Sequence, residues 1–241
     1  MTRVLAVIPA RYGATRFPGK PLATLWGKPM LEHVWRRASA APGIDALVIA
    51  TDDERIASVA GGFGAEIEMT PSGLASGTDR VAEVARRRPS FTIVLNLQGD
   101  EPELDSHAVG RLVAAMREDA AIRMATLAHQ EQEPSALAAE DVVKVVVDDF
   151  GRALYFSRAD IARGSHGGPA LRHVGVYGFR RDLLLEFASW APGELERAER
   201  LEQLRALERG VDIKVITGAR AFAGVDTPEQ LAALERRGPR D

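Results

Sequence analysis

The sequence predicts an α/β fold with a mostly parallel central sheet. Short apolar runs rich in leucine and β-branched residues, such as Val4–Ile8, Ala46–Ala50 and Phe91–Leu97, alternate with longer amphipathic stretches. Runs of this kind are typical of buried parallel strands covered by helices on both faces. The alternation ends near residue 140, so about 140–190 is predicted to form a small mixed α+β subdomain. A length of 241 residues suits one domain, 1–241, that contains this subdomain.

Helix boundaries follow from capping residues. Thr51-Asp52-Asp53 precedes one amphipathic stretch, and for Asp52 we favour capping over ligand contact. Thr227, Pro228 and Gln230 form a capping box that opens the last helix. Helices are expected at about 29–41, 54–63, 80–87, 105–117, 194–209 and from 228 onward.

Composition excludes several classes of partner. The net charge of −3 argues against nucleic acid and anionic membranes, so local basic clusters are expected to bind small anions. There is no cysteine, which excludes disulfides and thiolate chemistry. No apolar stretch reaches membrane-spanning length, and a cytoplasmic protein is expected.

The first strand leads into a glycine-rich loop with three cations, Arg11, Arg16 and Lys20. Its spacing differs from that of a P-loop, since five residues separate Gly13 from Gly19. A single arginine there would most simply be solvated. Three cations on a glycine-rich turn after a central strand instead favour a polyphosphate ligand.

Two aspartates are candidate metal ligands. Asp100 follows the most apolar strand, at the position where open α/β sheets bind ligands, although a turn role is equally compatible. Asp226 lies just outside the last helix, where capping does not explain it.

A third group of polar residues lies in the second half. His173, Gly175 and Tyr177 share one face of a predicted strand. A lone histidine is more often structural than catalytic. Together with Arg158 and Glu202-Gln203, however, the group suits an acidic, polyhydroxylated substrate.

These segments are similar to motifs of one family, the 3-deoxy-manno-octulosonate (Kdo) cytidylyltransferases. The resemblance runs from about Val4 to Leu234. It is carried by 9–22, 76–80, 98–102, 155–159, 172–178, 201–205 and 223–230. It implies a Rossmann-like, three-layer nucleotide-diphospho-sugar transferase fold, with Mg²⁺ as cofactor and CTP as substrate. CMP would pass to a small acidic acceptor, a Kdo-type 2-keto sugar acid, with release of pyrophosphate, in lipopolysaccharide precursor synthesis. The mixed subdomain would serve as a lid or build a homodimer.

The resemblance also assigns roles to residues. Nucleotide binding is expected of Ala10, Arg11, Gly13, Arg16, Lys20, Ser76, Gly77, Thr78, Arg80 and Gln98. Catalysis is expected of Arg11, Lys20 and Asp100, and metal binding of Asp100 and Asp226. Acceptor binding is expected of Gln98, Arg158, His173, Tyr177, Glu202 and Gln203.

Two departures from the family pattern leave alternatives open. Pro71 and Leu74 stand where the family usually has Arg and His, and the segment 159–171 is shorter than usual. The acceptor could therefore be a small carboxylated phosphonate such as phosphonoformate, in phosphonate biosynthesis. A catalytically silent nucleotide-binding regulator is a third hypothesis, against which both aspartates and the three loop cations argue.

Overall fold

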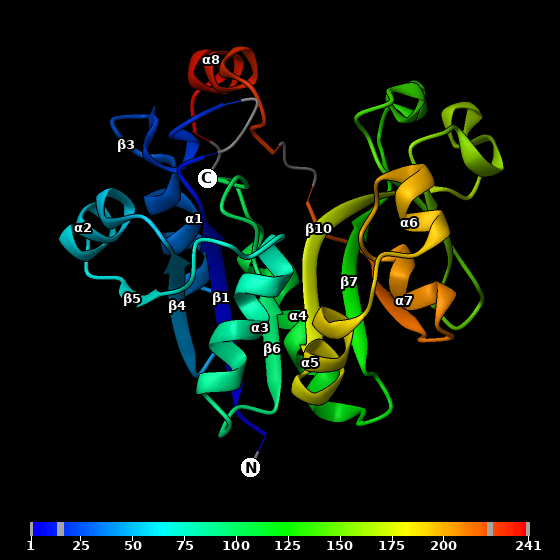
Figure 1. The fold of residues 1–241 in the computed structure, drawn as a ribbon. Coiled ribbons are helices and arrows are strands. Elements are labelled where there is room, and N and C mark those ends of the chain that lie inside the picture. Colours follow the sequence, from blue (N-terminus) through cyan, green and yellow to red (C-terminus); the bar gives the residue numbers. More distant parts are fainter. Residues whose placement is uncertain (1, 14–16, 221–223, 240–241) are drawn as a thin grey trace. The chain divides into compact units, whose positions relative to one another are not determined.

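The computed structural model describes residues 2–13, 17–220 and 224–239 (Figure 1). The chain divides into two compact units. Unit 1 comprises residues 1–106 and 222–241, and unit 2 comprises residues 107–221. Among the described residues, no helix has both the length and the apolar character of a membrane span.

Unit 1 is built on a parallel sheet. Its strands are β1 (Val4–Ala10), β4 (Ala46–Thr51), β5 (Glu66–Met69) and β6 (Ile93–Asn96), in the order β6-β1-β4-β5. β1 and β6 are almost completely buried, which explains their apolar sequences. The chain moves outward from β1 through β4 to β5 and then returns to β6 on the other side of β1. This reversal creates a topological switch point between β1 and β6.

Helices cover both faces of this sheet, as the sequence predicted. α3 (Gly77–Arg87) packs across β1, β4 and β6, and α1 (Met30–Ser39) packs on β1 and β4 from the opposite face (Figure 1). α2 (Glu54–Gly62) packs against β4 and β5. A short ribbon, β2 (Thr24–Leu25) and β3 (Lys28–Pro29), follows the 3₁₀ turn η1 (Lys20–Leu22). The last helix, α8 (Pro228–Arg237), packs on β2 through Leu234, which belongs to the same buried cluster as Leu25.

The caps of α2 and α8 were predicted with mixed success. Thr227 and Gln230 form the predicted capping box of α8. At α2 the cap is Asp53, whose carboxylate accepts from the Arg55 amide at 3.0 Å. The prediction for Asp52 was wrong, because its carboxylate pairs with Arg80 at 3.2 Å instead.

Unit 2 has a mixed sheet. β7 (Met124–His129) runs parallel to β11 (Ile213–Ile216) and antiparallel to β10 (Leu171–Arg180). β10 also pairs with β8 (Lys144–Val147), which forms a hairpin with β9 (Ala153–Ser157). The predicted subdomain, 140–190, lies inside this unit. Unit 2 also contains α4 (Ser106–Glu118), η2 (Pro134–Ala138), η3 (Ile161–His166) and α5 (Arg181–Ser189). The sequence analysis did not predict α5.

The single helix predicted at 194–209 is wrong. The structure has α6 (Glu194–Glu199) and α7 (Leu204–Glu208), separated by Arg200 in the left-handed region at φ 56°. The break lets Arg205 form a two-pronged ion pair with Glu196, at 2.6 and 2.8 Å. Nine residues would span about 13 Å of continuous helix, so an unbroken helix would hold these charges apart.

Candidate active site

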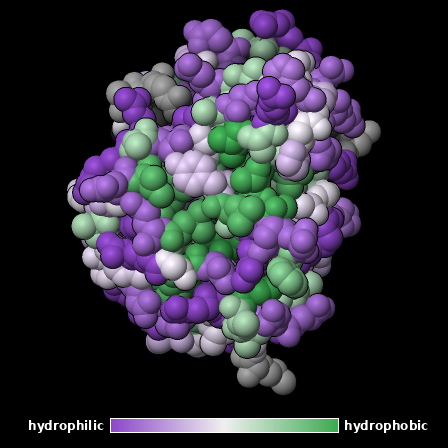
Figure 2. Space-filling model, turned by 90° about the vertical axis from the view of Figure 1, so that its right-hand side faces the viewer, coloured by the Kyte–Doolittle hydropathy of each residue, from purple (hydrophilic) through white to green (hydrophobic). Residues whose placement is uncertain are grey.

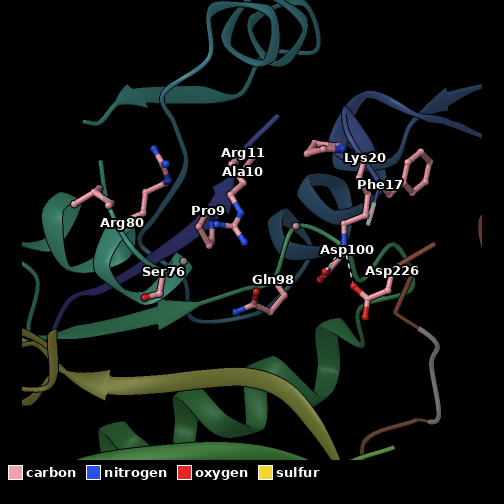
Figure 3. A pocket seen from close by; sticks show the side chains of 14 residues that line it. Pro9, Ala10, Arg11, Phe17, Lys20, Ser76, Arg80, Gln98, Asp100 and Asp226 are labelled. Carbon is pink, nitrogen blue, oxygen red and sulfur yellow. Dashed lines mark hydrogen bonds and ion pairs between the residues drawn. The ribbon is translucent and has the colours of Figure 1, made fainter. Parts of the chain in front are cut away.

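A cavity of about 300 Å³ opens at the switch point of unit 1 (Figure 3). This volume is at the lower end of the range for small-molecule sites. Segments that follow β1 and β6, together with the start of α3, form its walls. The lining residues are Pro9, Ala10, Arg11, Phe17, Lys20, Pro21, Leu74, Ser76, Gly77, Arg80, Gln98, Gly99, Asp100 and Asp226.

Gly99 allows the two central strands to approach each other at this point. A Cβ atom at position 99 would lie 3.1 Å from the carbonyl oxygen of Pro9, closer than most real Cβ contacts. The backbone after β6 therefore passes directly beside the end of β1. This close approach places Gln98 and Asp100 next to Ala10 and Arg11.

Lys20 joins the two predicted metal ligands. Its ammonium lies 2.6 Å from Asp100 Oδ2 and 3.1 Å from Asp226 Oδ1 (Figure 3). The Lys20 side chain is 12% exposed, whereas the carboxylates are 30% and 44% exposed and remain open to the cavity. Two residues that are 126 positions apart in the sequence thus share one cation.

Two hydrogen bonds to the backbone fix the positions of the Asp100 and Asp226 side chains relative to each other. The Val225 amide donates to the carbonyl oxygen of Asp100 at 2.9 Å. The Asp226 amide donates to Gln230 Oε1 at 2.6 Å, so the capping residue of α8 also orients this aspartate. Packing of α8 is therefore connected directly to the geometry of the Lys20 site.

The predicted nucleobase segment lies on the opposite wall. Ser76 lines the cavity and also caps α3, where it accepts from the Asp79 amide at 3.0 Å. The guanidinium of Arg80 is turned away from Asp100 (Figure 3) and bonds to Asp52 and Thr70. Arg80 therefore ties the start of α3 to the ends of β4 and β5.

A buried asparagine, which the sequence analysis missed, supports this wall. Asn96 is fully buried at the end of β6 and donates to Thr78 Oγ1 at 3.1 Å, while its Oδ1 accepts from Gln98 Nε2 at 3.2 Å. Thr78 itself is buried and does not line the cavity. A polar residue inside an otherwise apolar strand is the signal that could have revealed it.

The loop of unit 1 carries the remaining predicted residues. Arg11 is exposed, lines the cavity, and makes no hydrogen bond or ion pair within residues 2–13, 17–220 and 224–239. Gly13 does not line the cavity, and Arg16 lies outside the described residues. The Gly19 amide donates to the Tyr12 carbonyl at 2.8 Å, which closes the loop at its base.

The Tyr12 ring packs on Gly19, whose φ of +74° and lack of a Cβ atom permit this contact. The guanidinium of Arg55 also lies over this ring, with its Cζ 3.4 Å from the ring centroid.

In unit 2, His173 and Tyr177 lie together as predicted, with ring centroids 5.5 Å apart. A bulge in β10 between Val174 and Tyr177 faces Thr126 of β7. Thr126 Oγ1 lies 2.8 Å from the Val176 carbonyl oxygen, 3.2 Å from that of Val174, and 2.9 Å from His173 Nε2.

These contacts determine the tautomer of His173. Thr126 has one hydroxyl proton, which the nearer carbonyl oxygen accepts, so the hydroxyl oxygen must accept from His173 Nε2–H. Burial lowers the pKa of His173 to about 3, which keeps the ring neutral. His173 Nδ1 is consequently an acceptor, and it suits a hydroxyl donor better than an anionic oxygen.

The other predicted acceptor residues also lie in unit 2. Arg158 follows β9 and is half-buried. Gln203, at the N-terminus of α7, is 4% exposed, and its Nε2 has no hydrogen-bond partner in the part of the chain that the structure describes. Glu202 Oε1 lies 3.7 Å from Arg205 Nη2. A buried amide without a partner is costly in a folded protein, and a bound ligand is one explanation for it.

Comparison with known proteins identifies the family. A family model described as Cytidylyltransferase matches residues 5–213. A 3-deoxy-manno-octulosonate cytidylyltransferase of Anaeromyxobacter sp. (strain Fw109-5) is 51% identical over 248 residues, covering 100% of both chains. One of Syntrophotalea carbinolica is 49% identical over 243 residues, covering 96% of this chain and 97% of its own.

A solved structure gives the same answer. CMP:2-keto-3-deoxy-manno-octonic acid synthetase, complexed with CTP, has a TM-score of 0.91 and 40% identity, with 98% of each chain covered. The nucleotidyltransferase fold and enzyme class predicted from the sequence are thereby confirmed. The chain belongs to the 3-deoxy-manno-octulosonate cytidylyltransferase family.

Proposed function

We propose that this chain transfers CMP from CTP to Kdo, or to a closely related 2-keto sugar acid, and releases pyrophosphate with the help of Mg²⁺. The observation that carries the proposal is the cavity of unit 1, where Arg11, Lys20, Asp100 and Asp226 converge at the switch point. The printed names of the relatives and the CTP-complexed neighbour support the same reaction.

The cations of this cavity account for the nucleotide half of the reaction. An acceptor oxygen attacks the α-phosphorus of CTP, the bond to the β-phosphate oxygen breaks, and negative charge grows on the departing pyrophosphate. Arg11 and Lys20 would hold the phosphates and neutralise that charge, which is most of what phosphoryl transfer requires of a protein. Ser76 and Gly77, at the start of α3, would contact the nucleotide on the opposite wall.

The carboxylates fit a magnesium ion. Asp100 and Asp226 both contact the Lys20 ammonium, at 2.6 and 3.1 Å, so the two carboxylates already converge on one positive charge. No set of three or more His, Cys, Asp or Glu residues in the described ranges could hold a metal. Mg²⁺ typically needs only one or two carboxylates, with phosphate oxygens and water as its other ligands. When bound, the ion would lower the pKa of the acceptor hydroxyl and polarise the phosphate.

Residues of unit 2 would select the acceptor. Arg158 suits the carboxylate of the sugar acid, because a guanidinium binds carboxylates through two parallel hydrogen bonds. Neutral His173 presents an acceptor nitrogen, and the buried amide of Gln203 presents unsatisfied donors. This mixture suits a molecule with one carboxylate and several hydroxyl groups.

The same residues weigh against the phosphonate alternative. Phosphonoformate has no alcohol hydroxyl groups, so it offers far fewer hydroxyl donors to His173 Nδ1 than a polyhydroxylated sugar acid does. The names of the relatives also refer to Kdo. A parallel assay of pyrophosphate release with Kdo and with phosphonoformate tests the proposal, and release with Kdo alone is the expected result. No pyrophosphate release with either acceptor, in a protein that still binds CTP, would favour the non-catalytic nucleotide-binding regulator instead.

We also propose that the protein acts in the cytoplasm as a homodimer through unit 2. Phe150 and Leu154, in the β8–β9 hairpin, are 72% and 61% exposed, which is unusual for large apolar side chains. Figure 2 shows a face on which hydrophobic residues gather in a central area bordered by hydrophilic ones. Sedimentation of wild type and Phe150→Ser tests this. A monomeric wild type at micromolar concentration would contradict the dimer.

A further inference from the structure

Lys144, in β8, is a buried cation that the proposed mechanism does not use. Its side chain is 0% exposed. The ammonium donates to the carbonyl oxygens of Ala139 at 3.2 Å, of Val142 at 2.8 Å, and of Arg158. In the described part of the chain the ammonium forms no salt bridge and no hydrogen bond to a carboxylate, and desolvation lowers the pKa of Lys144. An apolar side chain would fill this space at lower cost in free energy.

The three carbonyl oxygens use all three N–H donors of the ammonium. They belong to two segments, the turn 139–142 and the residue that follows β9. Arg158 connects these segments a second time, because its guanidinium donates to the carbonyl oxygens of Glu140 at 3.4 Å and Asp141 at 3.3 Å. Lys144 therefore fixes the backbone of Arg158 and also the turn on which the Arg158 guanidinium rests.

Glu199, at the end of α6, holds the same residue from its other side. Its Oε2 accepts from the Arg158 amide at 3.1 Å, and its Oε1 accepts from Ser157 Oγ at 2.7 Å. Both backbone polar groups of Arg158 are thus bonded to charged side chains. Among the described residues, the guanidinium has only long bonds to neutral carbonyls, which it can exchange for a stronger bond to a carboxylate.

We propose that Lys144 is a positioning residue that acts through Arg158 to orient the carboxylate of the acceptor. The role rests on the proposed function, in which Arg158 binds that carboxylate. Removing the ammonium would release the Arg158 carbonyl and loosen the turn 139–142, so the guanidinium would sample orientations that do not meet the acceptor. Misplacement of this kind weakens acceptor binding and leaves the nucleotide cavity of unit 1 unchanged.

The first test compares Lys144→Met with Lys214→Met. Lys214 also lies in unit 2 and donates to a backbone carbonyl, that of Phe150, but it is not among the hydrogen-bond partners that the structure describes for Arg158. Lys144→Met is expected to raise KM for Kdo at least about tenfold, as for the loss of a charge-assisted hydrogen bond, with KM for CTP unchanged. Lys214→Met should change neither constant. Equal rises in both KM values, or none in folded Lys144→Met, would contradict the proposal.

Chemical rescue separates the charge from packing. The chain has no cysteine, so Lys144→Cys carries a unique thiol. Alkylation of the unfolded protein with 2-bromoethylamine, followed by refolding, restores an ammonium at nearly the length of lysine, whereas iodoacetamide gives a neutral side chain. Only the ammonium product should recover the wild-type KM for Kdo. Equal recovery by both would assign Lys144 a packing role, and mock-treated wild type controls for refolding.

Hydrogen exchange tests the positioning role of Lys144 without relying on the enzymatic activity of the protein. Lys144→Met should accelerate amide exchange in 139–143 and 155–160, with 4–10 and 93–96 unchanged. A wild type inactive with Kdo would contradict the proposed function and with it the acceptor role of Arg158. Unchanged exchange in 155–160 would show instead that Lys144 does not hold Arg158, whatever the activity.

Discussion

Replacing Asp100 with Asn tests the role of the two carboxylates most sharply. The side chains have nearly the same shape, so the change removes a charge and little else. Lys20 keeps its contact with Asp226 at 3.1 Å, and the ion pair is partly exposed. We therefore expect the free energy of unfolding to change by no more than about 1 kcal/mol. Turnover, however, should fall by on the order of 10²-fold or more, or about 2.7 kcal/mol of transition-state stabilisation.

The assay is pyrophosphate release at saturating CTP and Kdo, with Mg²⁺ titrated upward. Asp148→Asn is a matched control, because Asp148 also forms a short ion pair, 2.7 Å from Arg152, in a hairpin of unit 2. It should keep wild-type turnover at a similar cost in stability. Normal turnover of Asp100→Asn at saturating Mg²⁺ would refute the assignment of Asp100 as a metal ligand.

Three further predictions concern the strands around the site. Because the folded pKa of His173, about 3, lies below its unfolded value near 6.5, the unfolded chain binds the extra proton, and stability should fall as pH drops from about 6.5 toward 3. In urea unfolding, the free energy of unfolding of His173→Gln should lack this loss of stability at low pH. The same pH dependence of stability in wild type and variant would contradict the prediction. Thr126→Val should raise KM for Kdo several-fold by freeing the histidine tautomer, which the ¹⁵N shifts of the ring report directly; an unchanged Nε2–H tautomer would contradict the assignment. Gly99→Ala should raise KM for CTP, since the new Cβ would lie 3.1 Å from the Pro9 carbonyl, whereas Gly73→Ala, with nothing within 4 Å, should not.

Much of the site was predictable because its residues lie at strand ends. Asp100 follows β6 and Lys20 lies in the loop that follows β1, and parallel strands bring their carboxyl ends to one edge of a sheet. Asp226 was harder to place from local pattern, since the contacts that bring it to Asp100, such as the Val225 amide bond and the packing of α8, join segments that are far apart in the sequence. The family resemblance supplied that pairing.

The misplaced elements depend on long-range contacts that periodicity does not encode. The break between α6 and α7 brings Arg205 back to Glu196, and this ion pair between residues nine positions apart is not visible in the helical periodicity. Asp52 looked like a cap, but Arg80, 28 positions later, lies within reach of its carboxylate. Lys144 reads in the sequence as an ordinary strand residue, and its three carbonyl partners become visible only in the folded unit.

We propose, above all, that this chain activates a hydroxylated 2-keto sugar acid with CTP. Pyrophosphate release from CTP and Mg²⁺, measured in parallel with Kdo and with phosphonoformate, tests it most directly. Turnover with Kdo and none with phosphonoformate is the expected result. Turnover with phosphonoformate alone would contradict it and would make the short segment 159–171 part of a different specificity.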